Sequence, residues 1–446
     1  MLLILSLAQA VGLATAGLAT AGLATAGLAT AGPIASELAT SELQQRIEAA
    51  AVGSTIEVAP GNYFGPLLID KPLTLVGRGF PSIDGRGAGS VVSVRAQDVT
   101  VRGFHIHNSG INLSKDDAGV HITADRAVIS GNRIDDVLHG IYVKKSLGFR
   151  ISQNDVRGKT TLPPTARPAS EAIATDGAEY CAPLNVNSRG NGIHLWNSSG
   201  GEIDNNSITE TRDGMYFSFT RDTQVRGNHI NGVRYGLHYM YSDSNEFQGN
   251  TFTDNAAGAA IMYSKHMTII GNHFDSNHGF RAYGMLLNSV DNTHIEGNWL
   301  NHNTVGIYLE NNNNNRLVGN HIEGNYIGLR MTASSNDNVF SRNHLIGNMH
   351  SAEMVGQNDS NHWSVDGVGN YWSEANPVDI TGDGIGDLPY READLIGDLR
   401  RDAPMVGLLS DSPGMNLLKF VHRHVALPGF DAIEDPAPLT QHYERP

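Results

Sequence analysis

The chain has 446 residues, which is enough for two or three ordinary domains or for one large repetitive one. Fifty glycines, numerous asparagines, 7% aromatic residues and 17% charged residues are typical of many short strands and tight turns rather than a helical bundle. The formal net charge of −15 argues against a nucleic-acid-binding face, and against tight binding of acidic polysaccharides unless a cation bridges the like charges.

Residues 1–33 form an uncharged, low-complexity segment that opens with an apolar run and then repeats Gly-Leu-Ala-Thr-Ala from Gly12. Small residues such as Ala8 and Ala10 suit signal-peptidase cleavage, although the basic start of an ordinary signal peptide is missing. The segment predicts export to the periplasm. No later stretch is apolar enough to cross a bilayer, so we expect no membrane span.

A repeat of about 22 residues runs through the middle of the chain. An apolar residue, two variable positions and an asparagine recur, the asparagines being Asn132, Asn154, Asn206, Asn228, Asn250, Asn272, Asn298, Asn320 and Asn343. A glycine opens an alternating apolar run in step with them. Each period therefore holds three short strands, and only stacked periods can bury the apolar positions. The pattern predicts an all-β, right-handed parallel β-helix over residues 34–372, with the asparagines stacked inside one turn.

Two segments interrupt or follow the repeat. Residues 158–189 break the register, are rich in Pro, Thr and Ala, and include the single cysteine, Cys181; we expect a loop or small subdomain at one corner. Residues 373–446 form a C-terminal tail with an Asp/Gly loop, a short helix over Met415–Val425 and an extended, proline-rich end.

The first candidate metal site lies on the strand that follows each repeat glycine. Alternation places the second and fourth residues of this strand outward, among them His194, His238, Met240 and Met262. Thioether and imidazole groups together suit copper(I), a soft ion. The alternative is a protein-docking surface of methionines and aromatics, including Tyr216, Tyr241 and Tyr263.

Three other sets of polar and sulfur-containing residues are candidates for binding or structural roles. Met349, His350 and Met354 form a compact second copper candidate near the end of the repeat. Asp379, Asp383 and Asp387 are spaced by glycines, which suits either a calcium loop or a structural turn. His229, His273, His321 and His344 each follow a repeat asparagine and are expected on the turn surface.

An enzymatic alternative rests on adjacent carboxylates. Many β-helix proteins cleave or epimerise sugars, and Asp116-Asp117 could supply two carboxyl groups. Neighbouring strand residues face opposite sides, however, so a solvated turn is the expectation. A polysaccharide lyase, hydrolase or epimerase remains the alternative to a binding protein.

Several motifs resemble the NosD family of periplasmic maturation proteins for nitrous oxide reductase. They are Ala59-Pro60-Gly61-Asn62-Tyr63, Ile69-Asp70-Lys71-Pro72-Leu73, Gly369-Asn370-Tyr371-Trp372-Ser373, Asp383-Gly384-Ile385-Gly386-Asp387 and the closing Asp435-Pro436-Ala437-Pro438-Leu439. The resemblance covers about residue 50 to the C-terminus. It implies a non-enzymatic protein that docks on a membrane ABC transporter, the NosF ATPase with the NosY membrane subunit. It also implies that copper is taken from the lipoprotein NosL and delivered to apo nitrous oxide reductase, NosZ. The resemblance supplies no ligand residues.

Overall fold

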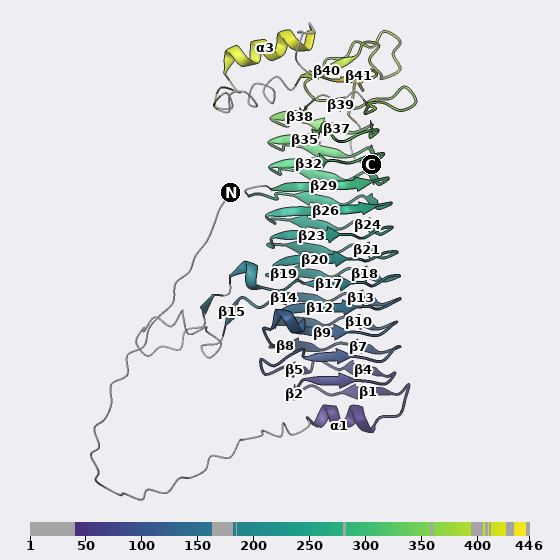
Figure 1. Ribbon diagram of the computed structural model, residues 1–446, viewed down its shortest axis with the longest axis vertical. Helices are drawn as coiled ribbons and strands as arrows, with labels where there is room; N and C mark the ends of the chain where they lie inside the picture. Colours follow the sequence, from purple (N-terminus) through teal and green to yellow (C-terminus); the bar gives the residue numbers. More distant parts are fainter. Residues whose placement is uncertain are drawn as a thin grey trace, which may run out of the picture. The chain divides into compact units, whose positions relative to one another are not determined.

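A computed structural model describes residues 41–162, 182–183, 185–279, 282–356, 360–393, 405, 409, 412–424 and 432–442. The predicted signal segment, residues 1–33, and Cys181 lie outside these residues. The described body is a parallel β-helix, in which three strands per coil build three parallel sheets that run along the stack (Figure 1). The predicted all-β, three-strand coil is thereby confirmed.

The first sheet precedes the repeat asparagine in each coil. It has twelve strands in stacking order: β1 (Thr55–Val58), β4 (Thr74–Gly77), β7 (Thr100–Arg102), β10 (Val128–Ser130), β13 (Arg150–Ser152), β18 (Glu202–Asp204), β21 (Gln224–Arg226), β24 (Glu246–Gln248), β27 (Thr268–Ile270), β30 (His294–Glu296), β33 (Arg316–Val318) and β36 (Val339–Ser341).

The second sheet begins just after the asparagine. Its thirteen strands are β2 (Asn62–Phe64), β5 (Ser82–Asp84), β8 (His105–His107), β11 (Arg133–Val137), β14 (Asp155–Gly158), β19 (Ser207–Thr209), β22 (His229–Asn231), β25 (Thr251–Thr253), β28 (His273–Asp275), β31 (Trp299–Asn301), β34 (His321–Glu323), β37 (His344–Ile346) and β39 (Tyr371–Trp372).

The third sheet contains the repeat glycine and the longest strands. Its twelve strands are β3 (Leu67–Ile69), β6 (Val92–Val94), β9 (Ala118–Ile122), β12 (His139–Lys144), β17 (Ile193–Trp196), β20 (Asp213–Ser218), β23 (Tyr235–Met240), β26 (Ala257–Lys265), β29 (Tyr283–Asp291), β32 (Val305–Glu310), β35 (Ile327–Thr332) and β38 (His350–Val355).

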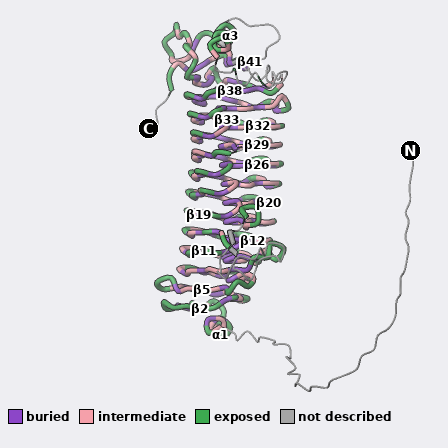
Figure 2. Tube along the Cα trace, turned by 90° about the vertical axis from the view of Figure 1, so that its left-hand side faces the viewer, coloured by how far each residue is buried: buried purple, intermediate pink, exposed green. Residues whose placement is uncertain are grey.

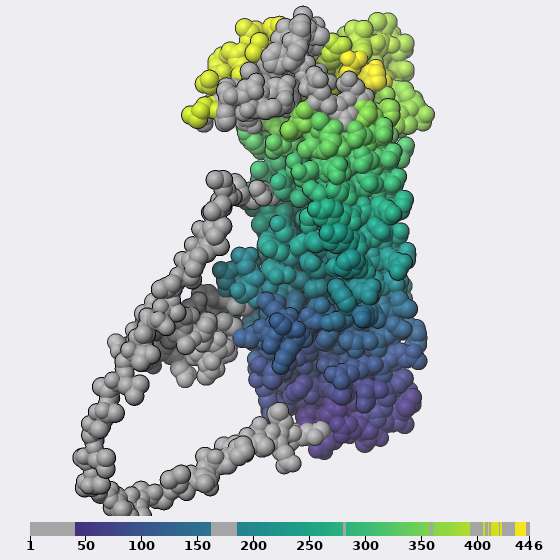
Figure 3. All heavy atoms as spheres, viewed as in Figure 1, coloured from purple at the N-terminus to yellow at the C-terminus, as the bar shows by residue number. Residues whose placement is uncertain are grey.

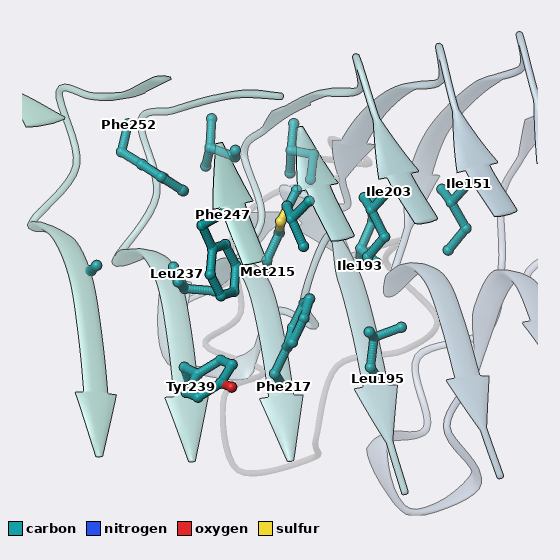
Figure 4. Packing of buried hydrophobic residues seen from close by; sticks show 14 of the residues in the cluster. Ile151, Ile193, Leu195, Ile203, Met215, Phe217, Leu237, Tyr239, Phe247 and Phe252 are labelled. Atoms are coloured by element: carbon teal, nitrogen blue, oxygen red, sulfur yellow. The ribbon is translucent and has the colours of Figure 1, made fainter. Parts of the chain in front are cut away.

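Apolar side chains from all three sheets fill the interior of the coils. Met215, Phe217, Leu237 and Tyr239 of the third sheet point inward toward Phe247 of the first (Figure 4). Buried residues line the inside of the stack while exposed ones gather at the turns (Figure 2), and neighbouring coils pack in contact along the column (Figure 3). Because each coil buries its faces only against its neighbours, the core is continuous along the stack.

The repeat asparagines form the predicted interior ladder. In each coil the side-chain Nδ2 donates to Oδ1 of the asparagine in the next coil, as from Asn250 to Asn272 and from Asn272 to Asn298, at 2.9 and 3.0 Å. The backbone N–H of Asn250 donates to the same Asn272 oxygen. A second ladder, which was not predicted from the sequence, runs along another corner through Asn255, Asn277, Asn303, Asn325 and Asn348. These amides satisfy buried backbone groups at the bends.

The repeat glycines are required by close approach of the coils. A Cβ at Gly236 would lie 2.5 Å from the backbone oxygen of Gly258 and 2.7 Å from the ring of Phe252. Gly214 and Gly306 meet the same obstruction from the coil that follows them. Any side chain here would push neighbouring coils apart, which explains why this column keeps glycine.

Short elements close the two ends of the stack. Helix α1 (Glu42–Ala49), capped by Ser41, buries Leu43 and Ile47 against the first coil. At the other end β40 (Tyr390–Ala393) and β41 (Ala432–Asp435) pair antiparallel, and α3 (Pro413–His424) agrees with the helix predicted in the tail. Strand β41 lies within the proline-rich end, where an extended chain is predicted. In the register break, β15 (Thr161–Leu162) pairs antiparallel with β16 (Ala182–Pro183).

Candidate metal site on the third sheet

The outward face of the third sheet carries a row of histidine and tyrosine rings. Consecutive rings contact one another from His121 through Tyr142, His194 and Tyr216 to His238, with centroids 4.3–5.2 Å apart. The row is more covered than alternation alone predicts, since Tyr142 is only 5% exposed. Near this end of the row Lys144 makes a 2.9 Å ion pair with Asp116, from the segment that follows the 3₁₀ turn η1 (Leu113–Lys115).

Asp213 is the charged centre of this row. Its side chain is fully buried and accepts two hydrogen bonds from Arg234, at 2.8 and 2.7 Å, and one from His238 Nδ1 at 3.0 Å. Burial alone would raise the pKa of Asp213, but the hydrogen bonds from His238 and Arg234 outweigh it and hold that pKa below its ordinary value. Asp213 is therefore an ionised, buried anchor.

The bond to Asp213 sets the chemistry of His238. Because a carboxylate can only accept, Nδ1–H of His238 donates a hydrogen bond to Asp213, which leaves Nε2 as the nitrogen that carries a lone pair in the neutral form of the ring. A histidine whose second nitrogen donates to a carboxylate is the usual arrangement of a metal ligand, since that bond fixes the tautomer and the ring orientation. Nε2 is therefore the nitrogen through which His238 could bind a metal.

His194 has the opposite tautomer. Asn191 donates from Nδ2 to His194 Nδ1 at 3.1 Å, and Arg212 fixes this amide orientation by donating to Asn191 Oδ1 at 3.1 Å. The proton of His194 therefore lies on Nε2. Burial first, and then the neighbouring His139 and Arg212, lowers the pKa of His194 well below its ordinary value, so the ring is neutral. Tyr216 also separates His194 from His238, so the structure does not bring the two together.

The two predicted methionines lie directly opposite each other. Met240 of β23 and Met262 of β26 are register partners in adjacent coils, about 4.8 Å apart along the stack, and both are half-buried. His238 lies two residues before Met240 on the same face of β23. We call His238, Met240 and Met262 the thioether patch. The nearby Met267 belongs to the core and is 1% exposed.

The second copper candidate is not brought together. Met349 is 50% exposed, whereas Met354 is 7% exposed and packs in the core opposite Met331. His350 is buried at the start of β38. The side chain of Met354 therefore points away from the surface that Met349 occupies.

The aspartates of the tail loop serve as hydrogen-bond acceptors for their own turn. Asp379 accepts from the backbone N–H groups of Gly382 and Gly384, and Asp387 accepts from Ile380. These bonds, the one from Gly384 first, lower the pKa of Asp379. Among the residues that the structure describes, no group of three His, Cys, Asp or Glu side chains could hold a metal ion. The carboxylates of Asp379 and Asp387 thus hold the turn together through hydrogen bonds.

Two sequence expectations need correction. Asp117 is 4% exposed and accepts from the backbone of Asn112, so the Asp116-Asp117 pair is not a solvated turn. The histidines that follow the ladder asparagines begin strands of the second sheet instead of lying on turns. His321 stacks between Trp299 and His344, with centroids 4.1 and 4.6 Å away and planes 5° apart. The stack joins rings from successive coils of the second sheet, and it contains no methionine.

Asp213, Arg234 and Asn191 were missed as functional residues. Asp213 could have been identified from the sequence, because it lies immediately before the repeat glycine Gly214. The same position in the next three coils holds Tyr235, Ala257 and Tyr283. A carboxylate at a position that is otherwise uncharged indicates a special role for that coil.

The buried neutral histidines predict a loss of stability in acid. Burial lowers the pKa of His139 and of His344 to about 4. The unfolded chain, with its histidine pKa near 6.5, binds more protons between about pH 6.5 and pH 4, so the free energy of unfolding should fall as the pH drops through this window. Each of the two histidines should contribute about 3 kcal/mol to this loss in the free energy of unfolding. Urea unfolding at pH 7 and pH 4.5 measures the loss, which His139→Gln should reduce; equal pH dependence in both proteins would contradict the assignment.

Comparisons with known proteins match this chain to one described family. The family model described as "Periplasmic copper-binding protein (NosD)" matches residues 171–377. The "Probable ABC transporter binding protein NosD" of Pseudomonas aeruginosa is 32% identical over 398 residues, covering 86% of this chain and 87% of that protein. The protein of the same description from Stutzerimonas stutzeri is 31% identical, covering 85% of each chain.

Among solved structures, the A-module of the Azotobacter vinelandii mannuronan C-5 epimerase AlgE6 matches with a TM-score of 0.57 at 15% identity, covering 74% of this chain and 94% of that module. The A-module of the AlgE4 enzyme gives a TM-score of 0.51 at 13% identity, covering 71% of this chain and 93% of that module. These matches show a shared β-helix fold. The fold and the sequence matches place this chain in a class of β-helix proteins whose family model is described as periplasmic copper-binding. In particular, the chain belongs to the NosD family. Within the described residues, no helix has the length and apolar character to span a bilayer.

Proposed function

We propose that this chain is a non-enzymatic periplasmic accessory protein that binds copper(I) transiently and passes it on for the maturation of nitrous oxide reductase. The observation that carries the proposal is the thioether patch, in which the Asp213-anchored His238 lies beside the paired Met240 and Met262. One neutral imidazole and two thioethers form a soft ligand set. The family description supports copper as the cargo.

The proposed partners follow from the family. The relatives are described as ABC transporter binding proteins, which supports docking on a membrane transporter, here the NosF ATPase with the NosY subunit. NosL is the proposed copper donor and apo nitrous oxide reductase, NosZ, the proposed acceptor. No nucleic acid is expected, because the net charge is −15.

Copper(I) competition tests the patch directly. The variant His238→Ala/Met240→Ala/Met262→Ala should bind copper(I) at least about 100-fold more weakly than the wild type, because all three proposed ligands are removed. A chromogenic chelator under anaerobic conditions reports the affinity.

The control is Met349→Ala, which removes an exposed thioether outside the thioether patch and should leave the affinity unchanged. Equal affinity of the triple variant and the wild type would refute the ligand assignment.

A polysaccharide-modifying enzyme is the second candidate. The buried Asp213 beside Arg234, His238 and Tyr216 is an acid–base set with perturbed groups, which is common at active sites. Burial raises the pKa of Tyr216, so this phenol is a poor base at neutral pH. Turnover of alginate or pectin by the purified chain would establish this candidate instead.

A further inference from the structure

Three aromatic side chains form an exposed ridge at one corner of the β-helix. Phe219, Tyr241 and Tyr263 occupy the same position in successive coils, each one residue after the outermost position of the third-sheet register. They are 55%, 47% and 51% exposed. Their rings stack with centroids 5.5 and 5.1 Å apart and planes 10° apart. We call these residues the corner ridge.

The backbone at the corner ridge is unfavourable for aromatic residues. All three have positive φ, +53°, +49° and +51°, in the left-handed region. The same column in neighbouring coils has the same φ but holds residues such as Asn197, Ser289 and Asn311. Asparagine tolerates this conformation, whereas a bulky residue there is an outlier. Neither burial nor backbone preference accounts for three consecutive aromatics, and such strain is typical of functional positions.

Another exposed aromatic residue with positive φ, Phe80, has a contact within the chain that accounts for its position. Phe80 has φ +56° and is 41% exposed. The guanidinium of Arg133 lies 4.2 Å from the centre of its ring. Phe80 therefore has an intramolecular cation partner over its face, whereas the ridge rings contact only one another in the aromatic and cation contacts of the described residues.

The shape of the ridge indicates what binds it. A planar group inserted between two rings needs about 7–8 Å between their planes, so the stack is closed to sugars or bases entering between the rings. The stack forms an apolar strip, and its Phe219 and Tyr241 line an open pocket of about 570 Å³ together with Arg221, Asp243 and Lys265. An apolar strip with a mixed-charge hollow is typical of a protein–protein contact with an aromatic centre and a polar rim.

The position of the ridge identifies the partner, on the basis of the proposed function. Tyr241 directly follows Met240 and Tyr263 directly follows Met262. A protein seated on the ridge would therefore lie next to the two residues that carry the thioethers, close enough for copper(I) to pass by ligand exchange. We propose that the corner ridge docks the protein that hands copper(I) to the thioether patch, a carrier with an apolar groove beside a soft copper site.

The test replaces the three ridge residues with asparagine, the residue found at the same position in other coils. Phe219→Asn/Tyr241→Asn/Tyr263→Asn should fold with unchanged or raised thermal stability, because asparagine accepts the left-handed backbone. The probe is purified soluble NosL, the proposed donor, immobilised for binding measurements without copper. Its dissociation constant should rise at least about tenfold, as expected when aromatic hot spots are lost. Phe80→Asn is the matched control and should leave the dissociation constant for NosL unchanged.

Two copper sources separate docking from copper binding. The ridge variant should take up copper(I) from a small bicinchoninate chelate at the wild-type rate, but from copper-loaded NosL about tenfold more slowly. The inference would be overturned if the ridge variant bound NosL as tightly as the wild type does, or if it lost affinity only for apo reductase. Equally slowed copper uptake from the chelate and from NosL would also overturn it. If the wild type takes no copper from the chelate, the proposed function fails, while NosL affinity still decides the ridge.

Discussion

Replacing Asn272 with alanine is expected to lower the free energy of unfolding by about 4 kcal/mol, because one amide serves several buried groups at once. Its Oδ1 accepts from the backbone N–H and the side chain of Asn250 at 2.9 Å, and its Nδ2 donates to the carbonyl of Phe247 at 2.9 Å and to Asn298 at 3.0 Å. Alanine leaves these partners unsatisfied in a place that water does not reach.

Chemical denaturation of the full chain measures this loss. The matched control is Asn62→Ala, at an exposed asparagine in β2 whose side chain makes no hydrogen bond within the described residues. It should change the free energy of unfolding by less than about 0.5 kcal/mol. If Asn272→Ala is as mild as this control, the ladder does not hold the coils together.

The Asp213→Asn variant should be affected in both stability and copper affinity. The substitution keeps the shape but removes the charge that faces Arg234 and Arg212 and the acceptor for His238 Nδ1. Breaking a buried pair typically costs 3–5 kcal/mol, and the partial exposure of Arg234 places the expected loss near the lower end, about 3 kcal/mol. Loss of the bond that orients a metal-binding imidazole should weaken copper(I) binding about 10- to 100-fold.

The isosteric control for Asp213→Asn is Asp254→Asn, at an exposed position with φ +53° that asparagine tolerates. Denaturation and chelator competition on both variants give the two readouts. A destabilised Asp213→Asn protein that still binds copper with wild-type affinity would show that Asp213 is a structural anchor only, and that His238 needs no orienting group.

The repeat was readable from the sequence because each coil makes the same local demands. The asparagine column of Asn272 supplies amide partners to buried backbone groups at one bend. The glycine column of Gly236 has no room for a side chain, because a Cβ there would lie 2.5 Å from the backbone of the next coil, so both residue types recur with the period. The capping helix was missed although Ser41, Leu43 and Ile47 have the spacing of a capped amphipathic turn.

The site could be predicted only in part, because its decisive features are contacts between coils. Alternation identified Met240 and Met262 as outward-facing, and the structure pairs them. The tautomers of His194 and His238 depend on Asn191 and Asp213, and Asp213 is 25 residues away from His238 in sequence. The pairing of β40 with β41 likewise joins residues 43 positions apart, such as Arg391 and Glu434, which no local pattern reveals.

X-ray absorption spectroscopy of the copper(I)-loaded wild-type chain tests the central claim most directly, because it reports the atoms bound to the metal. The thioether patch predicts one imidazole nitrogen and two sulfur neighbours, with the sulfur contribution lost in Met240→Ala/Met262→Ala. A first shell of nitrogen and oxygen alone, or a sulfur shell that persists in the double variant, would contradict copper binding at His238, Met240 and Met262.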